Sequence, residues 1–230
     1  MKTIGLIGGM SWESTAHYYT ELNRGINSAL GGLHSAQILL YSVDFGPIEK
    51  LMTKEDWNSI EDIMADAARK VEKGGADFLL ICTNTMHKLT DTVEKAVNIP
   101  LLHIADATAQ VLVHDKIKKI GLLGTAYTME QAFYKDRLIS KFDLDVITPD
   151  EEDRKIIHDI IFNELCLGKL TDQSRKAYIN ISEKLVQKGA RGIILGCTEI
   201  GMLLKQKDID IPLYDTTRIH AAKAVEWALK

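Results

Sequence analysis

The sequence contains few of the residues that build disulfide frameworks, zinc centres or basic surfaces. It has three cysteines among 230 residues, Cys82, Cys166 and Cys197, and none lies in a CxxC pair. Their odd number and spacing argue against a disulfide framework and a zinc ribbon, and favour a reducing cytoplasm. The formal net charge of -4 at pH 7 offers no basic field for nucleic acid and no cationic face for a membrane. We therefore expect a small-molecule partner, neutral or anionic, held by local groups.

Sequence motifs of cofactor and metal enzymes are also missing. The glycine-rich stretch GLIGGMS does not form GxGxxG, and neither a GxxxxGK(S/T) loop nor a GxSxG elbow occurs. The seven histidines show no HExxH spacing, so we expect no metal. No phosphate-binding loop can be paired with a Schiff-base lysine, so we expect neither pyridoxal phosphate nor another cofactor. The N-terminal MKTIGLIGGM is too short for a signal peptide or a membrane span.

The sequence does contain short apolar runs that alternate with stretches of helical periodicity. The runs of strand length are TIGLIG, SAQILLYSV, ADFLLIC, IPLLHI, KIGLLG and RGIILG. Between them, EDWNSIEDIMADAARKVEKGG predicts a helix that stops at its glycine pair. Its apolar face comprises Trp57, Ile60, Ile63, Met64, Ala67, Ala68 and Val71. This alternation is typical of βαβ units, so we expect an α/β fold with parallel sheets.

Two of these units resemble each other. KGGADFLLICTNT (73–85) and QKGARGIILGCTE (187–199) share a glycine-alanine pair, an apolar run and a polar turn. Matching Ala76 to Ala190 gives an offset of 114 (190 minus 76), which aligns Thr83 with Cys197. GLIGG likewise echoes GLLGT, and NIPLL echoes DIPLY. The chain therefore looks like two related α/β halves.

Thr83 and Cys197 both follow predicted strands, and ligands of parallel sheets collect beyond the carboxyl ends of strands. If the halves face each other, these two residues lie on opposite walls of one cleft. Successive strand residues point to opposite faces, so Cys82 and Thr83 cannot both face that cleft. The repeat selects Thr83 and leaves Cys82 to the core; we expect Cys166 to be structural too. A helix N-terminus after GCTE would lower the pKa of the Cys197 thiol from about 8.5.

Other polar residues at the predicted strand ends admit two interpretations. Asn84, Thr85, Thr198 and Glu199 either cap the next helices or help to hold a carboxylate, and the two roles are compatible. Small residues at Gly8 and Gly9 would let the amides of Met10 and Ser11 approach a ligand, and Thr125 and Thr128 would serve the other half. His87 is either a hydrogen-bonding group of the site or an ordinary histidine.

The motifs GLIGGMS, CTNTMH, HIADAT, GLLGTAYTMEQAFY and GCTEIG resemble those of the aspartate/glutamate racemase family, which comprises cofactor-independent amino acid racemases. The resemblance spans essentially the whole chain. It implies two pseudo-symmetric Rossmann-like halves, 1–104 with 213–230 and 105–212, with the active cleft between them. It also implies a homodimer.

The family's two cysteines correspond here to Thr83 and Cys197, a pair that resembles a bacterial subgroup specific for L-aspartate and L-glutamate. This implies two-base racemisation at Cα. A threonine hydroxyl is a far weaker acid than a thiol, so we expect Thr83 to start as proton donor and Cys197 as thiolate base, with assistance from His87 or a water. Aspartate-specific relatives also use an arginine after the second strand and a lysine near LGK. DFGPIEK has no arginine, and Lys169 is the nearby lysine.

Several alternatives therefore stay open. The preferred substrate is aspartate, glutamate or a broader set of amino acids. A related hydantoin racemase, maleate isomerase or malonate decarboxylase needs only one cleft cysteine to protonate a carbanion. A protein that binds an acidic amino acid without catalysis would show saturable binding and no exchange at Cα.

Overall fold

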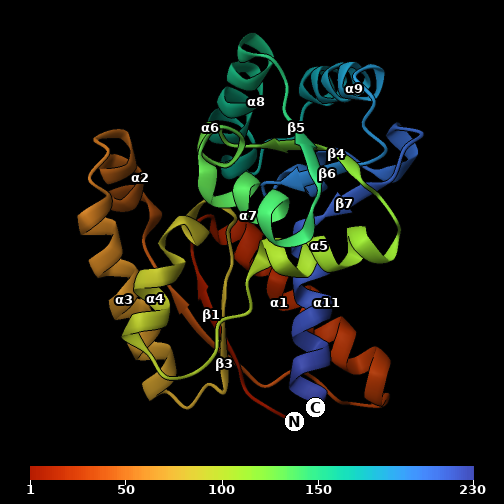
Figure 1. Ribbon diagram of the computed structural model, residues 1–230. Coiled ribbons are helices and arrows are strands. Elements are labelled where there is room, and N and C mark those ends of the chain that lie inside the picture. The colour runs from red at the N-terminus through yellow and green to blue at the C-terminus, as the bar shows by residue number, and fades with distance from the viewer. The chain divides into compact units, whose positions relative to one another are not determined.

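The computed structural model describes all residues from Met1 to Lys230, and the chain divides into two compact units. Unit 1 comprises Met1–Ile104 with His220–Lys230, and unit 2 comprises Ala105–Ile219 (Figure 1). The sequence interpretation placed the return to the first half at residue 213. In the structure residues 213–219 belong with unit 2, because strand β7 (Leu213–Asp215) pairs with β6 (Ile193–Gly196) of the second sheet.

Unit 1 is built on a parallel three-stranded sheet of order β2-β1-β3. Its strands are β1 (Ile4–Gly8), β2 (Ile38–Ser42) and β3 (Phe78–Ile81). Leu101 adds a single parallel bridge to Leu79, so the predicted IPLLHI strand is reduced to one bridge. The helical segments that end in this unit are α1 (Trp12–Leu30), α2 (Phe45–Thr53), α3 (Trp57–Lys73), η1 (Thr85–Leu89), α4 (Thr90–Ala96) and α11 (Thr216–Leu229).

Unit 2 is built on a parallel four-stranded sheet of order β5-β4-β6-β7. In addition to β6 and β7 it contains β4 (Lys119–Gly124) and β5 (Asp145–Ile147). Strand β5 was not predicted, because three residues are too few to show a periodicity. The helical segments are α5 (Ile104–His114), α6 (Ala126–Glu130), α7 (Ala132–Phe142), α8 (Glu151–Asn163), η2 (Leu165–Leu167), α9 (Asp172–Gln187), α10 (Ile200–Leu203) and η3 (Gln206–Asp208).

The two sheets repeat the same strand order and register, as the internal sequence similarity predicts. Gly5 of β1 faces Leu79 of β3, and Gly121 of β4 faces Ile193 of β6. The amide of Leu79 donates to the carbonyl of Pro100 at 2.9 Å, and the amide of Ile193 donates to that of Pro212 at 2.9 Å. The expected α/β fold with two parallel sheets is therefore confirmed.

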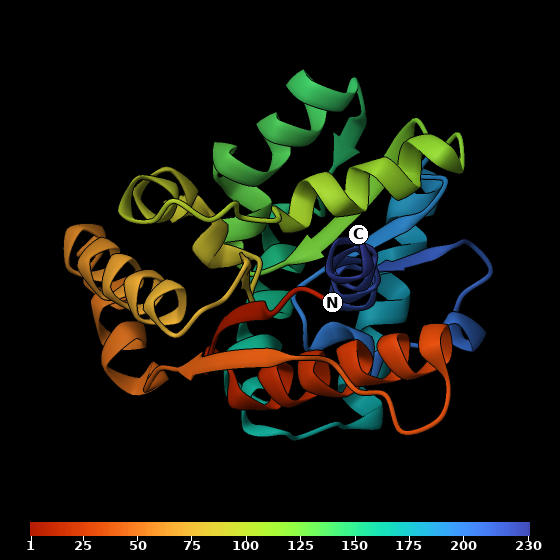
Figure 2. The ribbon, with the colours of Figure 1, turned by 90° about the horizontal axis from the view of Figure 1, so that it is seen from below.

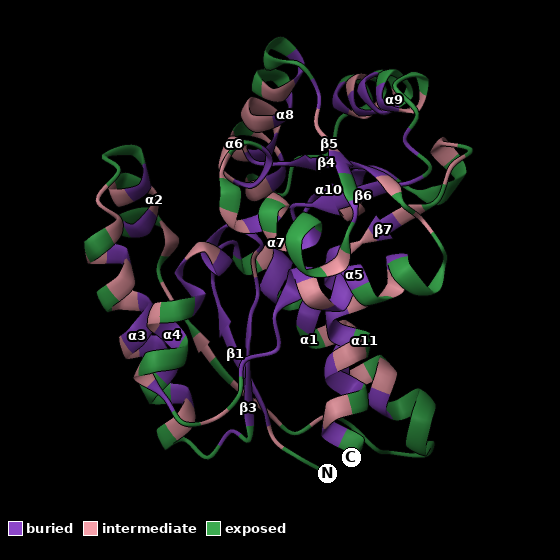
Figure 3. Ribbon diagram, in the orientation of Figure 1, coloured by how far each residue is buried: buried purple, intermediate pink, exposed green.

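Helix α3 forms where the apolar periodicity predicts it. Asp56 caps its N-terminus by accepting a 3.2 Å hydrogen bond from the amide of Ser59, and the helix ends at Gly74, before Gly75 with φ 98°. Ile60, Met64 and Val71 of α3 are buried. Figure 3 shows buried segments of this helix in purple. Burying each such side chain contributes about 2 kcal/mol to folding. This amphipathic face holds α3 against the sheet of unit 1.

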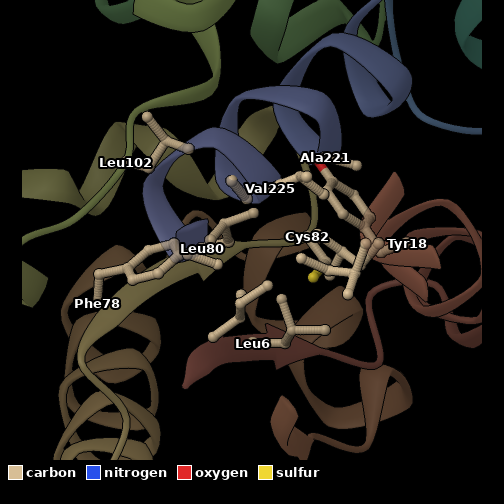
Figure 4. Packing of buried hydrophobic residues seen from close by; sticks show 13 residues of the cluster. Leu6, Tyr18, Phe78, Leu80, Cys82, Leu102, Ala221 and Val225 are labelled. Atoms are coloured by element: carbon tan, nitrogen blue, oxygen red, sulfur yellow. The ribbon is translucent and has the colours of Figure 1, made fainter. Parts of the chain in front are cut away.

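Helix α11 closes the core of unit 1, although it follows the first sheet by more than a hundred residues. Ala221, Ala224 and Val225 pack with the apolar side chains of β1 and β3 (Figure 4). The two chain ends lie together (Figures 1 and 2), and the amide of Lys2 donates to the carbonyl of Ala228 at 2.8 Å. No helix combines the length and the apolar character needed to cross a bilayer.

Candidate active site

In unit 1 the turns after β1, β2 and β3 gather at the carboxyl edge of the sheet, because all three strands run parallel. The amide of Val43 donates to the carbonyl of Gly8 at 2.9 Å, which joins the first two turns. Gly9 has φ +95°, and a Cβ atom there would lie 2.2 Å from the carbonyl oxygen of Val43. This close backbone approach explains why glycine is needed in GLIGGMS.

The structure separates Cys82 from Thr83 as strand alternation predicts. Cys82 is 1% exposed, and its sulfur lies in the apolar core with Leu6, Tyr18 and Leu80 (Figure 4). Burial raises the pKa of its thiol far above the ordinary range. Thr83, the next residue, is only partly buried. The assignment of Cys82 to the core is confirmed, and this thiol is unsuited to proton transfer at neutral pH.

His87 binds the main chain on both sides of its ring. Nδ1 lies 2.8 Å from the carbonyl oxygen of Thr83, and Nε2 accepts the amide of Ile104 at 3.2 Å. These contacts require the neutral tautomer with its proton on Nδ1. His87 thus holds the backbone of Thr83 in place, and both ring nitrogens already have main-chain partners.

Two further histidines, which the sequence analysis did not single out, pack around His87. Its ring centroid lies 4.5 Å from that of His103 and 5.9 Å from that of His220. His220 is fully buried, with Nε2 2.8 Å from the Leu102 carbonyl and Nδ1 2.8 Å from the Tyr18 hydroxyl. Burial lowers the pKa of His220 to about 4, so this ring is neutral at pH 7. Only the fold brings these histidines together.

The polar residues near the Thr83 turn differ in what they do locally. Ser11 is the N-cap of α1, where its hydroxyl accepts the amide of Ser14 at 3.3 Å. Asn84 stands at the N-cap position of η1 but forms no capping hydrogen bond with its side chain. Met10, Ser11, Asn84 and Thr85 are all buried. Capping therefore accounts for Ser11 and not for Asn84.

In unit 2 the corresponding turn follows β6 and carries Cys197, Thr198 and Glu199. The Cys197 thiol donates to Oε2 of Glu199 at 2.9 Å, and the Thr198 hydroxyl donates to the same oxygen at 2.8 Å. Cys197 and Glu199 are 8% and 2% exposed. A buried carboxylate therefore accepts a hydrogen bond from the Cys197 thiol. The sequence analysis missed this pairing, although only one residue separates the two.

The expected lowering of the Cys197 pKa is wrong. Burial, followed by the negative charge of Glu199, raises the pKa of this thiol well above its ordinary value. The helix that was expected to stabilise a thiolate, α10, is only four residues long and has no side-chain cap. Cys197 is consequently a neutral thiol in this state, and it donates its hydrogen bond to the Glu199 carboxylate.

The turn after β4 is held by threonines and by a histidine. Thr125 caps α6, and its hydroxyl oxygen accepts the amide of Thr128 at 3.3 Å and lies 3.2 Å from the Thr128 hydroxyl. The amide of Ala126 donates to Nδ1 of His158 at 3.2 Å. His158 comes from α8, and no local motif points to it. Both threonines are buried.

Lys169 and Cys166 lie in the segment between α8 and α9. The Lys169 side chain is exposed, while its amide donates to the Glu164 carbonyl at 2.9 Å. Cys166 lies in η2, is partly buried and forms no disulfide. Nothing within unit 2 gives Lys169 an anionic partner, so its suggested assisting role stays a prediction.

Comparisons with known proteins agree with this architecture. The profile of the Asp/Glu/hydantoin racemase family matches residues 7–224. The chain is 24% identical over 230 residues to a broad-specificity amino-acid racemase, RacX of Bacillus subtilis, which covers 96% of this chain and 96% of that protein. The family profile begins in β1 and ends in α11.

Solved structures show the same fold. A crystal structure of a candidate Asp/Glu racemase from Yersinia pestis aligns over 100% of both chains, with 52% identity and a TM-score of 0.92. An aspartate racemase homologue from Pyrococcus horikoshii OT3 also covers 100% of both chains, with 33% identity and a TM-score of 0.84. The chain therefore belongs to the Asp/Glu/hydantoin racemase family and is an isomerase of the amino acid racemase type.

Proposed function

We propose that the chain racemises an acidic amino acid at Cα without a cofactor, and that Cys197 and Thr83 exchange protons with opposite faces of that carbon. The single observation that carries the proposal is the buried Cys197 thiol, which donates to the Glu199 carboxylate in the turn after β6. Thr83 occupies the matching place after β3 in the repeated register. The assignment of Thr83 rests on this correspondence and on the family.

The hydrogen bond from the Cys197 thiol to Glu199 supports a definite order of proton transfers. Glu199 takes the thiol proton, and the resulting thiolate removes the proton from Cα. The electron pair left on carbon is delocalised into the α-carboxylate. Thr83 then delivers its hydroxyl proton to the opposite face. Solvent reprotonates the alkoxide, and Glu199 returns its proton to solvent, which restores the starting protonation state. Glu199 thereby replaces His87 as the assisting base, because both nitrogens of His87 are engaged by the main chain.

The developing charge on the α-carboxylate needs hydrogen-bond donors. We assign this role to Asn84, Thr85, Thr125 and Thr198, with Met10, Ser11 and Thr128 shaping the surrounding turns. A donor of this kind contributes about 3 kcal/mol to transition-state stabilisation. Asn84 supports the assignment because its side chain is buried and directly follows Thr83 in the turn after β3.

The test is exchange of the α-hydrogen in deuterium oxide, run separately on both enantiomers of aspartate, glutamate, asparagine and glutamine. We expect solvent deuterium at Cα together with loss of optical rotation. Saturable binding without exchange would identify a binding protein, and carbon dioxide release from a malonate would identify a decarboxylase. Sedimentation at several concentrations tests the predicted homodimer.

A further inference from the structure

Lys88 occupies a distinctive place in unit 1. It lies in η1, which follows the Thr83 turn, and in a 3-10 helix residues three apart lie on the same face. Lys88 therefore shares a face with Thr85. Its side chain reaches Trp57, the first residue of α3. Because β2 and β3 are parallel, α3 returns the chain from the carboxyl edge of the sheet to the start of β3. Trp57 consequently lies at the carboxyl edge of the sheet, the edge that also carries Thr83.

The charge of Lys88 is partly removed from water and has no anionic partner. Its Nζ lies 3.8 Å from the centroid of the Trp57 ring, and it forms no ion pair and no hydrogen bond. Burial lowers the pKa of Lys88, while the charge of Glu55, beyond ion-pair distance, acts in the opposite direction. The cation–π contact with Trp57 stabilises the charge of Lys88 by only about 1 kcal/mol. An anionic ligand beside Nζ would stabilise this charge further.

Lys70, in the same unit, is a lysine whose charge has both an aromatic and an anionic partner. Its Nζ also lies over an aromatic ring, 4.6 Å from the centroid of Tyr41. It lies 2.6 Å from Oδ2 of Asp66 and donates to the Tyr41 hydroxyl at 2.7 Å. Lys88 has the ring but lacks the carboxylate. Its three N–H donors remain available to a ligand.

We propose that Lys88 binds the side-chain carboxylate of a dicarboxylic amino acid and so selects acidic substrates over neutral ones. This inference rests on the racemase function proposed above and names a residue that selects its acidic substrate. The segment after β2 has no arginine, and Lys169 is exposed, so neither supplies a partly buried cation. Lys88 does, at the edge that carries Thr83.

The experiment compares Lys88→Met with Lys95→Met. Methionine keeps an apolar stem over Trp57 and removes the charge, and Lys95 is an exposed lysine of α4 in the same unit. We expect kcat/KM for aspartate and glutamate to fall about 10- to 100-fold in the Lys88 variant, since a charged hydrogen bond is lost. Values for asparagine and glutamine should change less than about twofold, and Lys95→Met should match the parent chain.

Each of the other possible results of this experiment overturns a specific part of the proposal or supports it. An equal loss for acidic and neutral substrates would show that Lys88 only supports the fold, and no loss would show that it stays solvated. If the parent chain exchanges only neutral amino acids, racemisation stands and the role of Lys88 falls. If it exchanges none, racemisation falls. In that case the affinity for L-aspartate, measured by calorimetry, tests the role of Lys88 in binding a carboxylate. This role stands only if the parent chain binds L-aspartate and the Lys88→Met variant binds it at least about tenfold more weakly.

Discussion

The turns that follow β3 and β6 share a register but differ in their proton chemistry. The β3 turn carries Thr83, a hydroxyl whose backbone is held by the neutral ring of His87. The β6 turn carries Cys197, a thiol that donates directly to the carboxylate of Glu199. A repeated backbone thus places Thr83 and Cys197 at equivalent positions, while their neighbouring residues give the two side chains different proton chemistry. We expect the two proton transfers to be unequal.

The largest effect should come from removing the thiol. Cys197→Ala should lower α-deuterium exchange on the order of 10³-fold with either enantiomer, because the substitution removes the proposed thiolate base. Cys82→Ala is the matched control, and we expect it to keep most of the activity with some loss of stability from the core cavity. Inactivation by the Cys82 substitution alone would reverse the assignment of the two cysteines.

A smaller loss is expected from Glu199→Gln. The amide still accepts a hydrogen bond from Cys197 but cannot take its proton, so the rate at neutral pH should fall about 100-fold. Removing the carboxylate charge also removes one cause of the raised Cys197 pKa, so the thiol should ionise at lower pH than in the parent chain. The rate of the variant should then recover as pH rises. A pH profile of kcat/KM and the ultraviolet absorbance of the thiolate test both statements, and unchanged activity at neutral pH would remove Glu199 from the mechanism.

Thr83→Cys should make the two turns more alike. Because enantiomers have an equilibrium constant of one, kcat/KM must match in the two directions, and any asymmetry appears in the separate kcat and KM values. A thiol at position 83 is a stronger acid than the hydroxyl, so the two kcat values should move closer together by a few-fold. Initial rates measured by circular dichroism from each enantiomer give this ratio. An unchanged ratio would argue against Thr83 as an acid/base group.

The smallest effect on turnover, but a clear one on stability, concerns His220 in unit 1. Its folded pKa of about 4 lies below the ordinary histidine value of 6.5, so between these pH values the unfolded chain binds a proton that the folded chain does not. Stability should therefore fall as pH drops from about 6.5 towards 4, by about 3 kcal/mol at most. Urea unfolding at several pH values should show a flatter pH dependence in His220→Gln, and an identical slope would show that other groups dominate.

The sequence by itself predicted the architecture, because strand runs, helical periodicity and the repeat are local patterns. The offset between Ala76 and Ala190 anticipated a register that the hydrogen bonds of both sheets reproduce. Strand alternation likewise separated Cys82 from Thr83. These inferences need only the period of a strand and the order of residues along the chain.

Tertiary structure decided the properties that depend on the spatial neighbours of a residue, namely pKa shifts and charge partners. Burial and the carboxylate of Glu199 reversed the expected pKa shift of Cys197. His87, His103 and His220 meet only after the chain folds, as do Lys88 and Trp57. Desolvation and charge proximity act through space, so the same residues in the same order leave the direction of a pKa and the partner of a charge undetermined until the chain is packed.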